Sequence, residues 1–148
     1  ARRPLMRLFA YGVLNRELAK GRAAELIAPL DEGRPATVRG TLYGLRGGDG
    51  GWYPILLPDA AGGTVHGMLH DASGVDWPAM DDFEDAHDGP DAEYARRELA
   101  VTLGDGTATS GFAYCYVRDL PGDAEPIPGG HFGTWLRETG RSAILGRD

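Results

Sequence analysis

A segment near residue 110 carries apolar side chains on both faces of a predicted strand. Successive residues of a strand point to opposite sides of the sheet, so alternate positions form one face. The two faces of residues 107–117 are Phe112, Tyr114 and Tyr116 on one side, and Ala113, Cys115 and Val117 on the other. Apolar residues on both faces are typical of a central strand or of a closed sheet.

A hairpin turn precedes this strand. Gly104-Asp105-Gly106 contains an Asp-Gly pair, which suits the positive backbone angles of a tight hairpin. We therefore expect the segments Tyr94–Leu103 and Thr107–Val117 to pair as antiparallel strands.

The remaining periodic segments add strands and helices to this hairpin. The pattern predicts further strands over Leu5–Ala10, Thr37–Leu45, Trp52–Leu57 and Val65–His70, and helices over Asn15–Leu26, Asp76–Ala86 and Phe132–Thr139. Strands with helices inserted after the first strand and in the middle are typical of the α+β class, with a curved sheet or small barrel flanked by helices. We expect the 148 residues to form a single domain, residues 1–148.

Composition narrows the choice of partners. The net charge is −7 and no basic stripe with interleaved aromatic residues is present, which argues against a nucleic-acid partner. No apolar run approaches the length of a membrane span, so we expect no membrane partner. Cys115 is the only cysteine, which excludes an internal disulfide and agrees with a reducing, cytoplasmic compartment. We interpret Cys115 as a buried apolar residue and not as a nucleophile.

Metal chemistry and serine chemistry lack their usual patterns. The histidines do not have the spacing of zinc ligands: His66, His70, His87 and His131. The acidic run near residue 80 lacks the central glycine and terminal glutamate of a calcium-binding EF-hand. Ser73 and Ser110 lack a G-x-S-x-G setting. We therefore expect neither a metal site nor a serine hydrolase.

The first candidate site is the end of the first predicted strand, where Leu8-Phe9-Ala10 runs into Tyr11-Gly12 and a helix start. Such a turn exposes successive backbone N–H groups that can hold an anion such as a carboxylate, and Gly12 allows a ligand to approach the backbone closely. A plain strand-to-helix turn is the alternative interpretation.

The second candidate lies in the acidic segment from Asp76 to Asp88. At about 100° per residue, one side of the predicted helix carries Trp77, Met80, Glu84 and His87, a flank carries Asp81, Asp85 and Asp88, and Asp82 points away. Glu84 is therefore the carboxylate directed toward the apolar side. An apolar setting raises a carboxyl pKa, which suits a group that takes and returns a proton near neutral pH. A partly exposed helix carboxylate is the alternative.

Together these segments resemble the γ-glutamylcyclotransferase-like family, of the γ-glutamylamine cyclotransferase type. The matching motifs, in chain order, are Leu8-Phe9-Ala10-Tyr11-Gly12-Val13-Leu14, Gly40-Thr41-Leu42-Tyr43, Tyr53-Pro54, Val65-His66-Gly67-Met68-Leu69, Met80-Asp81-Asp82-Phe83-Glu84 and Tyr94-Ala95-Arg96. The sequence departs from the family pattern at Val13, where threonine or serine is common, and at Asp85, where glycine often follows the glutamate.

The resemblance implies a small mixed β-barrel with flanking helices. It also implies a reaction in which the α-amine of a γ-glutamyl group attacks its own γ-carbonyl, releasing 5-oxoproline and a free amine. Glu84 would be the single catalytic acid/base, and no metal or organic cofactor would be needed. The substrate would be a small γ-glutamyl compound, bound by Tyr11, Gly12, Val13, Leu14, Tyr53, Pro54 and Tyr94.

Two other functions share these features. A non-catalytic relative, such as a binding module or an appended domain of a larger enzyme, could keep the same pocket, because fold does not determine activity. Another enzyme of the same fold is the third possibility.

Overall fold

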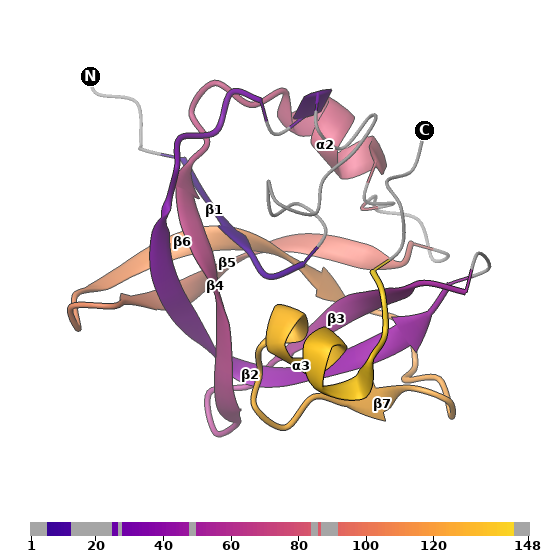
Figure 1. Ribbon diagram of the computed structural model, residues 1–148. Helices are drawn as coiled ribbons and strands as arrows, with labels where there is room; N and C mark the ends of the chain where they lie inside the picture. Colours follow the sequence, from indigo (N-terminus) through magenta and orange to yellow (C-terminus); the bar gives the residue numbers. More distant parts are fainter. Residues whose placement is uncertain are drawn as a thin grey trace, which may run out of the picture.

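A sheet that closes on itself forms the centre of the computed structural model, which describes residues 6–12, 25–26, 28–47, 50–83, 86 and 92–143 (Figure 1). Its elements in chain order are β1 (Arg7–Ala10), β2 (Arg34–Arg46), β3 (Trp52–Pro58), β4 (Gly63–Asp71), α2 (Trp77–Phe83), β5 (Tyr94–Leu103), β6 (Ala108–Tyr116), β7 (Glu125–Pro126) and α3 (Phe132–Thr139). No helix in these ranges is long and apolar enough to cross a membrane.

The barrel contains five of the strands, in the order β2, β4, β1, β6 and β5. It closes because β5 returns to β2, where Ala36 pairs with Leu103 and Thr37 with Thr102. Neighbouring strands are antiparallel except β1 and β6, which run parallel. This small mixed barrel with flanking helices confirms the predicted fold class.

β2 is long enough to serve two parts of the sheet. Its first half, from Arg34 to Gly40, pairs with β4, and its second half, from Gly40 to Arg46, pairs with β3. Gly40 stands at the junction, where a Cβ atom would lie 2.6 Å from the carbonyl oxygen of Leu57. The second half of β2, with β3 and the short strand β7, therefore forms a ribbon that continues beyond the barrel.

Two hydrophobic clusters lie on opposite faces of the barrel wall. The inner cluster takes residues from every barrel strand and includes Phe9, Ala36, Val38, Val65, Leu69, Val101, Ala113 and Cys115. α3 extends it over β2 and β3, because Phe132, Trp135 and Leu136 belong to the same cluster. The outer cluster lies beneath α2 and includes Leu8, Ala10, Ile55, Met80, Tyr94, Tyr114 and Tyr116.

These clusters explain the apolar residues on both faces of β6. Ala113 and Cys115 face the narrow interior, where small side chains fit, while Tyr114 and Tyr116 lie in the outer cluster. Val117 does not belong to this pattern: β6 ends at Tyr116, and Val117 is 42% exposed.

The predicted hairpin is confirmed, and several predicted boundaries are corrected. β5 and β6 pair antiparallel up to Thr102 and Ala108, and Gly106 in the turn has a φ of 89°. β2 begins at Arg34, before the predicted start, because its first residues pair with β4. The described part of α2 ends at Phe83, and Ala86, where the prediction ended, is not helical; residues 84 and 85 lie outside the described ranges. Of the helix predicted over Asn15–Leu26, only the last two residues lie within the described ranges, and both are helical.

Gly67 tests the packing of the barrel interior. A Cβ atom there would lie 2.4 Å from the carbonyl oxygen of Ala10 and 2.8 Å from the ring of Phe9. We expect Gly67→Ala to lower the free energy of unfolding by about 1–3 kcal/mol, because neither the strand nor the ring can move freely. Gly122→Ala is the control, since a Cβ atom there meets nothing within 4 Å. Equal urea midpoints for the two variants would contradict this account of the interior.

Candidate active site

β1 and the described part of α2 advance toward the same end of the barrel. β1 and β6 are parallel, with Leu8 opposite Phe112, so both strands advance toward that end. α2 runs along β6 in the same sense. At its start, the ring of Trp77 packs on Phe112 with centroids 5.9 Å apart. One turn later, Oδ1 of Asp81 accepts a hydrogen bond from the Tyr114 hydroxyl at 2.7 Å.

The sequence candidates follow these two elements directly. Tyr11 and Gly12 come after β1, and Glu84 comes after Phe83, the last residue of α2. Val13, Leu14, Glu84 and His87 lie outside the described residues.

The described residues of α2 agree with the helical phase read from the sequence. Met80 is fully buried, Trp77 is half-buried and Asp82 is exposed. Asp76 begins the helix, because its carboxylate accepts a hydrogen bond from the N–H of Ala79 at 3.1 Å, as an N-cap residue does. The helix therefore presents its apolar side to the barrel wall.

The Tyr11-Gly12 turn lies against the Tyr53-Pro54 segment of β3. A Cβ atom at Gly12 would lie 2.3 Å from Cγ of Pro54, so only glycine allows the chain to pass there. The Tyr11 hydroxyl donates a hydrogen bond to the backbone carbonyl of Tyr114. Two motifs that are about 40 residues apart in the sequence are thus neighbours in space.

Aromatic side chains from β5 and β6 lie next to the Tyr53-Pro54 segment. The Tyr94 hydroxyl donates to the Pro54 carbonyl at 3.5 Å, and the Tyr94 ring meets Tyr116 edge to face, with centroids 5.9 Å apart. The Tyr53 hydroxyl donates to Oε2 of Glu93 at 3.0 Å. Burial and the Glu93 carboxylate raise the pKa of Tyr116, so its phenol stays protonated at neutral pH.

An ion pair joins α2 to β5. Nε of Arg96 lies 3.2 Å from Oδ1 of Asp81. The guanidinium also covers the Trp77 ring, 4.5 Å from its centroid, and lies 5.5 Å from the centroid of Phe112. Asp81 thus interacts with both Arg96 and Tyr114, which holds α2 on the barrel wall.

Sequence reasoning overlooked three of these residues. It placed Asp81 only on the flank of a helix, and it gave no role to Glu93 or Tyr114 near the site. The available signal was the pairing of Met80-Asp81-Asp82-Phe83-Glu84 with Tyr94-Ala95-Arg96. Since Asp81 and Arg96 form an ion pair, the two motifs are physically coupled.

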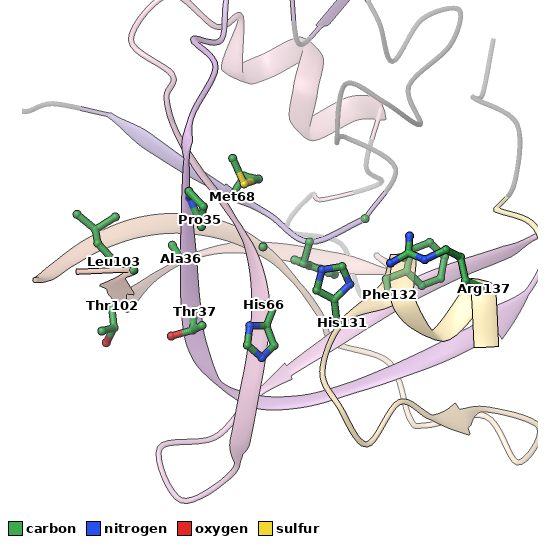
Figure 2. A pocket seen from close by; sticks show the side chains of 15 residues that line it. Pro35, Ala36, Thr37, His66, Met68, Thr102, Leu103, His131, Phe132 and Arg137 are labelled. Atoms are coloured by element: carbon green, nitrogen blue, oxygen red, sulfur yellow. The ribbon is translucent and has the colours of Figure 1, made fainter. Parts of the chain in front are cut away.

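A cavity of about 470 Å³ opens on another side of the Tyr11-Gly12 turn. We name it the α3 cavity, because His131 and Arg137 reach it from the region of α3, while His66 reaches it from β4 (Figure 2). Its volume is in the range of sites for small molecules.

The described residues do not support a cysteine nucleophile or a metal site. Cys115 is 1% exposed, and burial raises its pKa to about 11, so the thiol stays protonated at neutral pH. Within the described ranges, no three His, Cys, Asp or Glu residues are grouped to hold a metal ion.

The family model described as "Gamma-glutamyl cyclotransferase, AIG2-like" matches residues 8–137. A comparison with curated proteins finds no match.

Solved structures show the same fold at low sequence identity. YkqA from Bacillus subtilis is 15% identical, with a TM-score of 0.62; the match covers 93% of this chain and 43% of YkqA, less than half its length. A gamma-glutamyl cyclotransferase is 17% identical, with a TM-score of 0.62 and coverage of 84% and 73%. Kluyveromyces lactis allophanate hydrolase is 14% identical, with a TM-score of 0.60; the match covers 92% of this chain and 22% of the hydrolase.

Because Asp81 contacts Arg96 and Tyr114, we expect neutralising Asp81 to lower stability more than neutralising its neighbour Asp82. Asp81→Asn keeps the shape of the side chain but removes the charge that Arg96 and Tyr114 contact. We expect a loss of about 0.5–2 kcal/mol in the free energy of unfolding, since the Asp81 side chain is 25% exposed. Asp82→Asn, on an exposed residue, should change stability by less than about 0.5 kcal/mol. Equal urea unfolding curves for the two variants would show that Asp81 does not anchor α2.

Proposed function

The chain belongs to the gamma-glutamyl cyclotransferase, AIG2-like family, and on this premise we propose that it converts a γ-glutamyl amine or peptide into 5-oxoproline and a free amine. The observation that carries the proposal is the common direction of β1 and α2. Both elements advance toward the same end of the barrel, which supports the proposal that the turn beginning with Tyr11-Gly12 and the residue that follows α2 act on one substrate.

The proposed reaction needs no nucleophile from the protein. The α-nitrogen of the glutamyl group attacks its own γ-carbonyl carbon and forms the new C–N bond of a five-membered lactam. The original γ-amide C–N bond then breaks. The α-nitrogen loses two protons, one before the attack and one as the lactam forms. The departing nitrogen gains one of them to leave as an amine, and the amine takes up the other to become an ammonium ion, so the reaction is balanced without water or an oxidant.

Glu84 is the proposed carrier of the proton that passes from the α-ammonium group to the departing nitrogen. A carboxylate accepts the proton from the ammonium group, and the resulting acid donates it to the departing amine. A single group can perform both transfers if its pKa lies near the operating pH, which an apolar setting favours. Support comes from the described end of α2, where buried Met80 belongs to the same cluster as Tyr94.

The turn after β1 is the proposed site for the substrate carboxylate. Backbone N–H groups of Gly12, Val13 and Leu14 would hold the carboxylate and leave the side chain of the glutamyl group to fold back on its amine. Positioning of this kind accelerates an intramolecular attack without chemical participation by the turn. The contact between Gly12 and Pro54 supports a rigid backbone at this point.

The remaining residues support these two groups. Tyr53, Pro54 and Tyr94 are proposed to form the wall against which the glutamyl chain lies, with Tyr11 beside them. Asp81 and Arg96 are proposed as positioning residues, because their ion pair holds the helix that leads to Glu84.

A non-catalytic domain is the second candidate function. Its support is the occurrence of the same fold within longer chains, since this chain corresponds to 43% of YkqA and 22% of the allophanate hydrolase. Such a domain would bind a γ-glutamyl compound without releasing 5-oxoproline.

Substitution of Glu84 separates the two candidates. Glu84→Gln keeps the size and hydrogen-bonding capacity of the side chain but cannot accept a proton. We expect kcat for 5-oxoproline release to fall by about 10²–10⁴-fold, with little change in substrate affinity. The measurement is 5-oxoproline release from a panel of γ-glutamyl amines and dipeptides, together with calorimetric binding of one substrate.

Asp82→Asn is the matched control, since Asp82 is an exposed carboxylate in the same helix. It should leave kcat nearly unchanged. Equal losses in the two variants would indicate a general effect of acidic charge. Unchanged turnover in folded Glu84→Gln would overturn the mechanism, and binding without turnover by the unaltered protein would favour the non-catalytic domain.

A further inference from the structure

The α3 cavity has a basic lining in an acidic protein. Arg137, His66 and His131 contribute nitrogen groups, and Thr37 and Thr102 contribute hydroxyl groups across the cavity (Figure 2). Among the described residues that line it, none is aspartate or glutamate, although the chain has a net charge of −7. The local charge therefore favours an anionic ligand and disfavours a cationic one.

Two of these side chains, His131 and Arg137, lie close to Gly133, which has no side chain to fill the space between them. A Cβ atom at Gly133 would lie 3.5 Å from Cε1 of His131 and 3.7 Å from Nη1 of Arg137. The imidazole and the guanidinium therefore border the same small space above α3. A carboxylate is of a size to lie between these groups and can accept a hydrogen bond from each.

The orientation of His131 makes it a donor toward a ligand. Its Nδ1 accepts a hydrogen bond from the N–H of Thr134 at 3.2 Å, which caps α3. Because Nδ1 is an acceptor in this bond, the hydrogen of the neutral ring lies on Nε2. The second ring nitrogen is therefore available to donate to an anion.

Arg137 carries a charge that the described part of the chain does not neutralise. Arg141 lies 2.8 Å from Glu125, and Arg96 pairs with Asp81. Arg137, in contrast, donates to the hydroxyl of Thr134 at 3.2 Å and has no carboxylate within salt-bridge distance among the described residues. Its guanidinium can therefore pair with a carboxylate of a bound molecule.

We infer that the α3 cavity receives the departing half of the substrate, and that this half carries a carboxylate. The inference rests on the proposed function, because it places the glutamyl half at the Tyr11-Gly12 turn, which also lines the cavity. The substrate class is then a γ-glutamyl amino acid or peptide. A γ-glutamyl polyamine, whose departing half carries an additional ammonium group, fits the basic lining poorly.

Three substrates with the same glutamyl half test this inference. γ-Glutamylalanine carries the carboxylate, γ-glutamylethylamide is the same molecule without it, and γ-glutamylputrescine carries an ammonium group instead. We expect the highest kcat/KM for γ-glutamylalanine and the lowest for γ-glutamylputrescine, measured by 5-oxoproline release. Equal or reversed preference would overturn the inference while leaving the proposed function intact. A folded protein that releases 5-oxoproline from none of the three would overturn both.

The variant Arg137→Gln tests whether the preference for a carboxylate in the departing half depends on the α3 cavity. This variant should raise KM for γ-glutamylalanine by about tenfold, the usual scale for a charge-assisted contact, and leave KM for γ-glutamylethylamide unchanged. Arg39→Gln removes the same charge from an exposed residue of β2 that does not line the cavity, and should change neither KM. An equal effect of Arg137→Gln on both substrates, or no effect on either, would show that Arg137 does not bind the carboxylate.

Discussion

The parallel pairing of β1 with β6 is the constraint on which the candidate site depends. Because Leu8 lies opposite Phe112, the chain leaves β1 at the end toward which α2 also runs. Antiparallel pairing of the same strands would send the Tyr11-Gly12 turn to the other end of the barrel. The closed ring of strands fixes this arrangement, since β1 lies between β4 and β6 and cannot move along one without shifting the other.

Local patterns in the sequence predicted the elements well. The apolar residues on both faces of β6, the Asp-Gly hairpin and the terminal helix from Phe132 to Thr139 each depend on neighbours within a few residues, and each is present in the structure. β7 was not predicted, because its two residues, Glu125 and Pro126, have no apolar alternation and are ordered by pairing with the distant Tyr43 and Gly44.

Contacts between residues far apart in the sequence also limited the prediction of the candidate site. Helical phase identified the buried side of α2 from Trp77 and Met80, but it left Asp81 on a flank. The role of Asp81 depends on Arg96 in β5 and on Tyr114 in β6, and no periodicity within the helix reports on either partner. The α3 cavity is still less accessible to sequence reasoning, because five separate segments contribute to its lining.

One small substrate is proposed to occupy two neighbouring regions: the turn after β1 with the end of α2, and the α3 cavity. The most direct test is a crystal structure of the Glu84→Gln variant with γ-glutamylalanine bound. We expect the α-carboxylate at the backbone N–H groups of Gly12, Val13 and Leu14, the side chain at position 84 within about 3 Å of the α-nitrogen, and the alanine carboxylate at Arg137. A substrate bound away from the turn, or a side chain at position 84 more than about 10 Å from it, beyond any direct proton transfer, would contradict the account.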